Sequence, residues 1–209
     1  MVKNYKLSKE ADRMSHDNGT ANPNWFRPDV DPMAIRKLMQ KSDAIALRDT
    51  FVWLGAMCLS AGIAIALWPS WWSAPFWLLY GVLYGSASDS RWHECGHKTA
   101  FKTPWINNVV YQIASFMIMR NPAIWRASHI RHHTDTIVVG RDPEIVSMRP
   151  PDLLRIALMF VGIIDLCNAF KQMFLHARGR IDPSEAMYVT PNAYFKIFMI
   201  ARIWLTIYM

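Results

Sequence analysis

A stretch of 39 residues without a charged side chain, Thr50 to Ser88, most constrains what this chain can fold into. As one helix it would be about 58 Å long, roughly twice the hydrocarbon thickness of a bilayer. Pro69 and Pro75 would break that helix, and the tryptophans around them favour a membrane interface. The stretch predicts a transmembrane helical hairpin with spans near 50–68 and 72–88. A buried hairpin in a soluble core is the alternative, but a chain of 209 residues has little protein to cover it.

Composition supports a membrane protein, because 52% of the residues are hydrophobic and ten are tryptophan. The net charge of +7 then indicates topology and not a nucleic-acid partner. Lysines and arginines precede the first span and follow the second, whereas the turn between the spans has none. The N-terminus and everything just after the hairpin are therefore expected on the cytoplasmic side. Three scattered cysteines indicate free thiols in a reducing compartment.

The N-terminal part, residues 1–48, is expected to be a polar arm followed by a juxtamembrane helix. Asp31 is a good N-cap and precedes proline, so the helix should begin there and run to about Leu47. Its apolar residues alternate with basic ones, which suits either a helix lying on the inner leaflet or an ordinary packed amphipathic helix.

The rest of the chain predicts further helices. Residues 105–119 are apolar but short for a span and carry asparagines, which favours a re-entrant or interfacial helix. Residues 153–178 are expected to form one long surface-lying helix, since a crossing would place Lys171 and Arg178 outside. An incomplete span starts near Tyr194. The expected fold is an all-α integral membrane protein with a transmembrane hairpin, interfacial helices and a histidine-rich helical cap on the cytoplasmic side.

Five of the seven histidines lie within 41 residues, in two clusters. His93 and His97 are four residues apart, one turn along the same face of a helix. His129, His132 and His133 combine i, i+3 and i, i+4 spacing with an adjacent pair. Neutral imidazole is the commonest metal ligand, and five imidazoles exceed what one tetrahedral zinc takes from a protein. The clusters therefore favour a site for two metals.

Several other side chains are candidates beside these ligands. Asp135, Asp142 and Glu144 follow the second cluster and could accept hydrogen bonds from the outer ring nitrogens, although solvated loop carboxylates are an equal alternative. Glu94, between the first two histidines, is a further candidate beside the metal. His176 is either a sixth ligand or an ordinary surface or packed histidine.

The first cluster also satisfies H-E-x-x-H, the zinc protease motif in which the glutamate, here Glu94, is the general base. Such a protease needs one further ligand and not the three that the second cluster offers. The intramembrane protease therefore stays a secondary hypothesis.

H-x-x-x-H followed some 30 residues later by H-x-x-H-H, just beyond a membrane hairpin, resembles the membrane fatty acid desaturase and hydroxylase superfamily. The strings are His93-Glu94-Cys95-Gly96-His97 and Ser128-His129-Ile130-Arg131-His132-His133. The resemblance covers residues 50–150 well. It implies two non-haem irons held by the five histidines, O2 as co-substrate and electrons from a ferredoxin or cytochrome b5-type donor. Residues 49–209 would be a desaturase-like membrane domain acting on a lipid or fatty acyl chain.

The resemblance has one departure. The family's third histidine box is missing, since no histidine follows His176, and an apolar helix runs to Met209 without a flanking charge. This suggests a C-terminally truncated member with an incomplete site. An acyl-lipid desaturase is the first hypothesis. A hydroxylase of alkanes, fatty acids or carotenoids and a non-catalytic metal-binding membrane protein remain alternatives.

Overall fold

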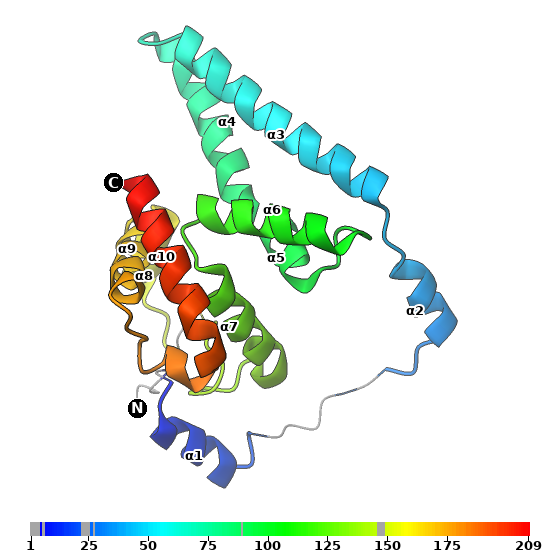
Figure 1. Ribbon diagram of the computed structural model, residues 1–209, viewed down its shortest axis with the longest axis vertical. Coiled ribbons are helices and arrows are strands. Elements are labelled where there is room, and N and C mark those ends of the chain that lie inside the picture. Colours follow the sequence, from blue (N-terminus) through cyan, green and yellow to red (C-terminus); the bar gives the residue numbers. More distant parts are fainter. Residues whose placement is uncertain (1–4, 6, 22–25, 27, 89, 146–148) are drawn as a thin grey trace. The chain divides into compact units, whose positions relative to one another are not determined.

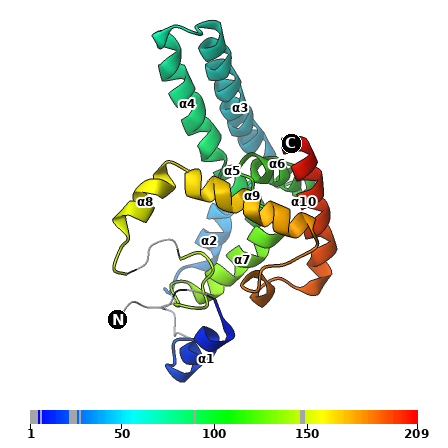
Figure 2. The ribbon, with the colours of Figure 1, turned by 90° about the vertical axis from the view of Figure 1, so that its left-hand side faces the viewer.

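The computed structural model describes the whole chain except residues 1–4, 6, 22–25, 27, 89 and 146–148 (Figures 1 and 2). Every regular element in the described residues is a helix, which confirms the all-α class. The chain divides into two compact units, Pro28–Ile118 and Met1–Arg27 with Met119–Met209. The domain boundary predicted near residue 48 lies inside a helix, α3, and stays a prediction.

The unit Pro28–Ile118 carries the first histidine cluster. Its elements in chain order are α2 (Pro32–Leu38), α3 (Asp43–Ala66), the 3-10 turn η1 (Trp71–Ser73), α4 (Ala74–Gly85), η2 (Ser86–Ser88), α5 (Ser90–His97) and α6 (Pro104–Met117).

The prediction of the juxtamembrane helix is right about where the helix starts and wrong about its length. The Asp31 carboxylate accepts the Met33 amide at 2.9 Å and begins α2, as expected. The helix ends at Leu38 and does not reach Leu47. The reason is a second start signal, because Ser42 caps the first turn of α3 and is followed by an acidic residue.

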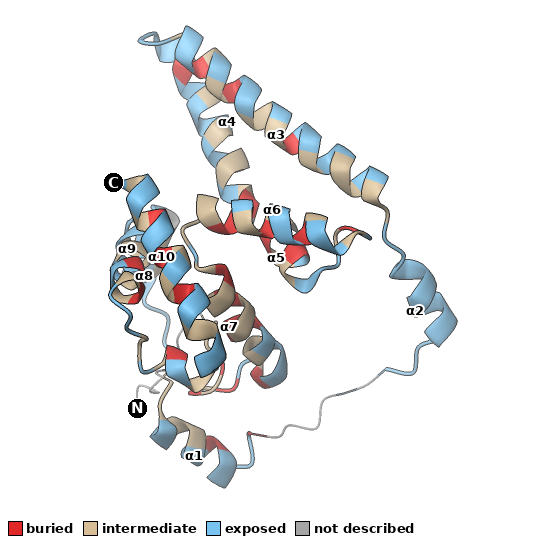
Figure 3. Cartoon of the chain, in the orientation of Figure 1, coloured by how far each residue is buried: buried red, intermediate tan, exposed pale blue. Residues whose placement is uncertain are grey.

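Helices α3 and α4 form the expected hairpin (Figures 1 and 2). α3 has 24 residues and is the one single helix among the described residues that is long and apolar enough to cross a membrane. The second predicted span, 72–88, is divided among η1, the 12-residue α4 and η2. Much of the hairpin's surface is exposed (Figure 3), including large apolar side chains such as Phe51, Leu59 and Val82. Such a surface suits contact with lipid.

Helices α5 and α6 pack together through buried polar contacts. The Trp92 indole N–H donates to Ser115 Oγ at 3.0 Å. Asn107, whose polarity argued against a span, is buried, and its side-chain amide bonds both the N–H and the C=O of Phe101. These bonds fix the segment between α5 and α6, because a buried polar group left unpaired would be costly.

The other unit carries the second cluster. Its elements are α1 (Lys9–Asp17), α7 (Pro122–Asp135), α8 (Leu153–Phe160), α9 (Ile163–Ala177), η3 (Glu185–Met187), η4 (Pro191–Ala193) and α10 (Tyr194–Tyr208). Ile197, Ala201 and Trp204 bury one face of α10, which packs on α9 and α7. The Asn121 side chain caps α7 and donates to the Ile197 carbonyl at 3.1 Å. The start of α7 is thereby fixed to α10.

The single long helix predicted over 153–178 is wrong. Gly162 has φ +74° and separates α8 from α9, whose axes differ by 72°. A left-handed glycine ends a helix readily, since it has no Cβ to clash with the chain. If the bent pair is counted as one span, the described residues contain two candidate membrane spans instead of one. Helix α9 ends at Ala177, shortly before Gly179, which has φ +72°.

Candidate metal centre

The first histidine pair lies on α5. The i, i+4 spacing brings the rings of His93 and His97 to a centroid separation of 4.8 Å, edge to face. The helix ends at once, because Lys98 adopts φ +61°. The Lys98 and Thr99 amides bond back to the Cys95 and Glu94 carbonyls at 3.1 and 2.9 Å. The pair therefore sits at the carboxyl end of a short, closed helix.

Contacts with the start of α3 hold α5 in place. Arg91 donates to the Asp49 carbonyl at 3.1 Å, and its guanidinium lies 5.2 Å from the centre of the Trp53 ring. At the other end of α5, the Lys41 ammonium donates to the Lys98 carbonyl at 2.7 Å. The two ends of the helix that carries the first pair are thus tied to the N-terminal half of α3 and to Lys41, just before α3.

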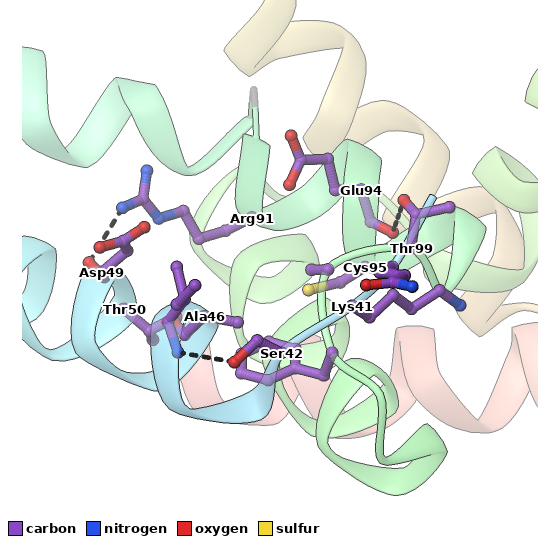
Figure 4. A pocket seen from close by; sticks show the side chains of 13 residues that line it. Lys41, Ser42, Ala46, Asp49, Thr50, Arg91, Glu94, Cys95 and Thr99 are labelled. Carbon is purple, nitrogen blue, oxygen red and sulfur yellow. Dashed lines mark hydrogen bonds between the residues drawn. The ribbon is translucent and has the colours of Figure 1, made fainter. Parts of the chain in front are cut away.

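A cavity of about 390 Å³ lies between these elements (Figure 4). Its lining includes Lys41, Asp49, Arg91, Glu94 and Cys95. Glu94, predicted beside the metal, is exposed and faces this cavity. Burial, and then the charge of Glu94, raise the pKa of the Cys95 thiol to about 12. Cys95 is therefore a neutral packed thiol at physiological pH.

The second cluster lies on α7. Trp125 stacks on His129 with ring centroids 4.3 Å apart and planes 17° from parallel. His129 is buried, whereas His133, one turn further, is exposed. Their Nε2 atoms are 3.1 Å apart. The His132 ring centroid lies 5.7 Å from that of His129.

Two carboxylates of the following loop bind the outer nitrogens of this cluster. Glu144 Oε2 is 2.8 Å from His129 Nδ1, and its Oε1 accepts the Ser128 hydroxyl at 2.7 Å. Asp142 Oδ1 is 2.9 Å from His132 Nδ1, with the Asp142 side chain only 2% exposed. A carboxylate at Nδ1 keeps the proton there and leaves the Nε2 lone pair available for a metal.

Asp135, the other predicted partner of a histidine, has a different role. Its carboxylate lies 3.3 Å from Arg131 Nε and 3.2 Å from Arg141 Nε, and its side chain is 4% exposed. Arg131 precedes it by one helical turn, so the two meet on one face of α7. The Asp135 carboxylate therefore pairs with two guanidinium groups and not with an imidazole.

His176 lies on α9, where its Nε2 atom pairs with Glu185 Oε2 at 2.8 Å. Both side chains are buried. Glu185 was not among the residues that the sequence singled out. It sits in a 3-10 turn after Asp182 and Pro183, and no spacing rule connects it to a helix nine residues away.

The His129–His133 geometry fits a metal. Imidazole nitrogens bind metal ions at about 2.0–2.1 Å, so two ligands at adjacent coordination positions, roughly 90–110° apart, lie roughly 2.8–3.4 Å from each other. The observed Nε2–Nε2 distance of 3.1 Å falls within that interval. Each unit therefore carries a histidine pair with ligand spacing, and in the second cluster carboxylates also fix the ring orientations of His129 and His132.

Fold and site together define an all-helical protein with histidine clusters of the metal-binding kind. The model of the family "Fatty acid desaturase" matches residues 69–209. The chain belongs to this family. The resemblance that the two histidine strings indicated is thereby confirmed, and family membership favours a desaturase over a zinc protease.

Curated relatives match over shorter segments. An omega-6 fatty acid desaturase of the endoplasmic reticulum (isozyme 1) from Glycine max is 34% identical over 73 residues, 34% of this chain and 19% of the relative. An sn-1 acyl-lipid omega-3 desaturase (ferredoxin) from Nostoc sp. (strain 36) is 32% identical over 74 residues, 35% of this chain and 20% of the relative. A Delta(12) fatty acid desaturase from Mortierella alpina is 32% identical over 73 residues, 34% of this chain and 18% of the relative. The matched segment spans about one fifth of these relatives. No solved structure matches the chain significantly.

Proposed function

We propose that the chain carries the first two histidine clusters of a membrane-bound, O2-dependent di-iron fatty acid desaturase. The observation that carries this proposal is the second cluster, where Nε2 atoms of His129 and His133 converge at 3.1 Å while carboxylates hold Nδ1 of His129 and His132. Family membership over residues 69–209 supports the reaction class.

In this proposal two non-haem irons are held by the five clustered histidines, His93, His97, His129, His132 and His133. Imidazole suits iron, and both pairs have the i, i+4 spacing that presents two ligands from one helix. When bound, the irons supply the oxidation, in which O2 and electrons from a ferredoxin or cytochrome b5-type donor remove hydrogen from an unactivated C–H bond. His176 is left out of the set, because its Nε2 atom is already paired with Glu185.

The protein's own part is orientation and water exclusion. Glu144 and Asp142 hold the Nδ1 protons of His129 and His132, so that both Nε2 lone pairs keep one direction. Trp125 covers one face of the His129 ring and shields it from solvent. A fixed, partly dry set of nitrogens is what a strongly oxidising site needs, because loose ligands and free water favour side reactions.

The proposed substrate is a lipid acyl chain, and the proposed location is the membrane. The 24 residues of α3 and the exposed apolar side chains of α4 support a hairpin in the bilayer. The basic residues flanking this hairpin favour a cytoplasmic location for both clusters. An apolar chain could then reach the metals directly from the bilayer.

Metal analysis of the detergent-purified full chain tests this proposal. After anaerobic loading with Fe2+ and desalting, we expect bound iron that falls in both His93→Ala and His129→Ala. The exposed thiol variant Cys58→Ala is the matched control and should keep its iron. Zinc that depends on His93 and His97 but survives His129→Ala would overturn the proposal in favour of a protease. Lipid analysis of cells that express this chain, and of cells that express a chimera with the C-terminal part of a curated relative, then tests for new double bonds.

A further inference from the structure

The N-terminal helix α1 is fastened to the loop that follows the second histidine cluster. Asp12 Oδ1 accepts Arg141 Nη1 at 2.7 Å and lies 3.6 Å from Arg131 Nη2. His16 Nε2 is 3.0 Å from the same Arg141 nitrogen. All four residues belong to one compact unit, although α1 lies outside the segment matched by the family model.

The two segments also touch through their backbones. Gly140, next to Arg141, is buried and has φ +84°. A Cβ built on Gly140 would collide with the Cβ of Ala11. Two reasons therefore require a glycine at this position: its left-handed backbone conformation and the close approach of α1.

The contact belongs to a balanced charge network of two arginines and two aspartates. Arg131 and Arg141 both lie against Asp135 Oδ2, and Arg131 Nε donates to the Arg141 carbonyl at 3.0 Å. The arginine side chains are only 18% and 16% exposed. Without Asp12 these two guanidinium groups would share one carboxylate, and their mutual repulsion would be poorly screened.

The same loop holds the histidine-orienting carboxylates. Asp142 directly follows Arg141, and its carboxylate accepts the Ile137 and Glu144 amides at 2.9 and 2.8 Å as well as His132 Nδ1. Ile137 has φ +65°, which is unfavourable for a β-branched residue. A loop with this strain keeps its conformation only where its surroundings determine it. The Asp142 carboxylate supports Ile137 directly, and the network with Asp12 holds the neighbouring Arg141.

We propose that Asp12 is a positioning residue and that α1 acts as a clamp on loop 136–145. Through Arg141 the clamp holds Asp142 and Glu144 in the places from which they orient His132 and His129. The part of this inference that concerns metal affinity rests on the proposed function. The part that concerns the order of the loop does not.

Hydrogen exchange of the metal-free full chain in detergent tests the clamp. We expect peptides covering 136–145 to exchange about tenfold faster in Asp12→Ala, since a partly buried charged hydrogen bond is lost. Peptides from α3 should not change. Glu10→Ala, an exposed acidic residue of the same helix, is the matched control and should behave as wild type. Asp12→Glu keeps the charge and should recover part of the protection. If the alanine variant does not fold, Asp12→Asn replaces it in the same measurement, because it also removes the charge.

Titration with Co2+, followed by its visible absorption, gives the second measurement. We expect about tenfold weaker binding in Asp12→Ala than in Glu10→Ala, as for other residues that orient metal-bound histidines. Unchanged exchange in loop 136–145 would overturn the clamp, whatever the metal does. If wild type itself binds no Co2+, the proposed function fails, while the exchange measurement still decides on the clamp.

Discussion

The Nε2 atoms of His129 and His133 lie 3.1 Å apart on one face of α7. The His129 ring is buried and stacks on Trp125, and its Nδ1 atom contacts Glu144. The His133 ring is exposed. In the proposed metal site the two histidines would have the same role as ligands, but their places in the fold differ.

This asymmetry predicts different results for the two alanine variants. His133→Ala should lose metal binding with little change in stability, because an exposed side chain contributes little to packing. His129→Ala should lose metal binding and also about 1–3 kcal/mol of stability, because Glu144 loses a partner and a buried ring leaves a gap. Thermal unfolding of the metal-free variants measures the difference. Equal losses of stability would contradict the roles assigned here.

Asp142 should be more sensitive to substitution than any other carboxylate of the loop. Asp142→Ala removes the acceptor of His132 Nδ1 and of the Ile137 and Glu144 amides. We expect a loss of about 2–3 kcal/mol in stability and roughly 10–100-fold in Co2+ affinity. Asp142→Asn keeps the shape and should fall between alanine and wild type. Asp152→Ala, at the exposed N-cap of α8, controls for loss of a loop carboxylate and should leave Co2+ affinity unchanged.

The histidine clusters were predictable from sequence because helical periodicity alone brings i and i+4 side chains together. The apolar hairpin was predicted differently, from the length of the uncharged stretch and the prolines near its middle. Neither kind of pattern gave warning of the break at Gly162, since one glycine in an apolar run is compatible with a continuing helix. The missed break depends on backbone conformation and not on side-chain pattern.

The sequence named Asp135, Asp142 and Glu144 as possible partners of the histidines but did not show which of them would meet a histidine. Asp135 and Asp142 are both acidic residues near the second cluster, but one meets arginines and the other a histidine. The choice depends on how the chain turns at Ile137, which has an unusual φ. The Asp12–Arg141 contact joins residues 129 positions apart, and no local rule reaches that far.

His176 gives a direct test between a ligand and a structural role. Its buried pair with Glu185 favours the structural role. In His176→Ala the buried Glu185 carboxylate would keep, among the described residues, the Asp182 amide as its hydrogen-bond partner, at 3.2 Å. We expect a loss of roughly 3 kcal/mol in stability with iron content retained in the folded fraction. Loss of iron without loss of stability would instead make His176 a sixth ligand.

The turn that carries Glu185 should contribute stability in a pH-dependent way. Asp182 Oδ1 accepts hydrogen bonds from the Ser184 hydroxyl at 2.6 Å and from the Ser184 amide at 2.9 Å. These bonds hold the pKa of Asp182 below its usual value of 3.8. A carboxyl whose pKa is lower in the folded state stabilises the fold above its unfolded pKa. That contribution is lost as the pH falls through the folded pKa. Ser184→Ala should therefore be less stable than wild type near neutral pH.

The difference between Ser184→Ala and wild type should shrink as the pH falls from about 5 towards 2. Urea unfolding followed by circular dichroism at several pH values measures it. Ser60→Ala on α3, whose hydroxyl donates to a backbone carbonyl of its own helix, is the control for loss of a serine hydroxyl. Its effect should not depend on pH in this range, because its partner does not titrate. A Ser184→Ala difference that stayed constant down to pH 2 would show that the serine stabilises the turn without acting through the charge of Asp182.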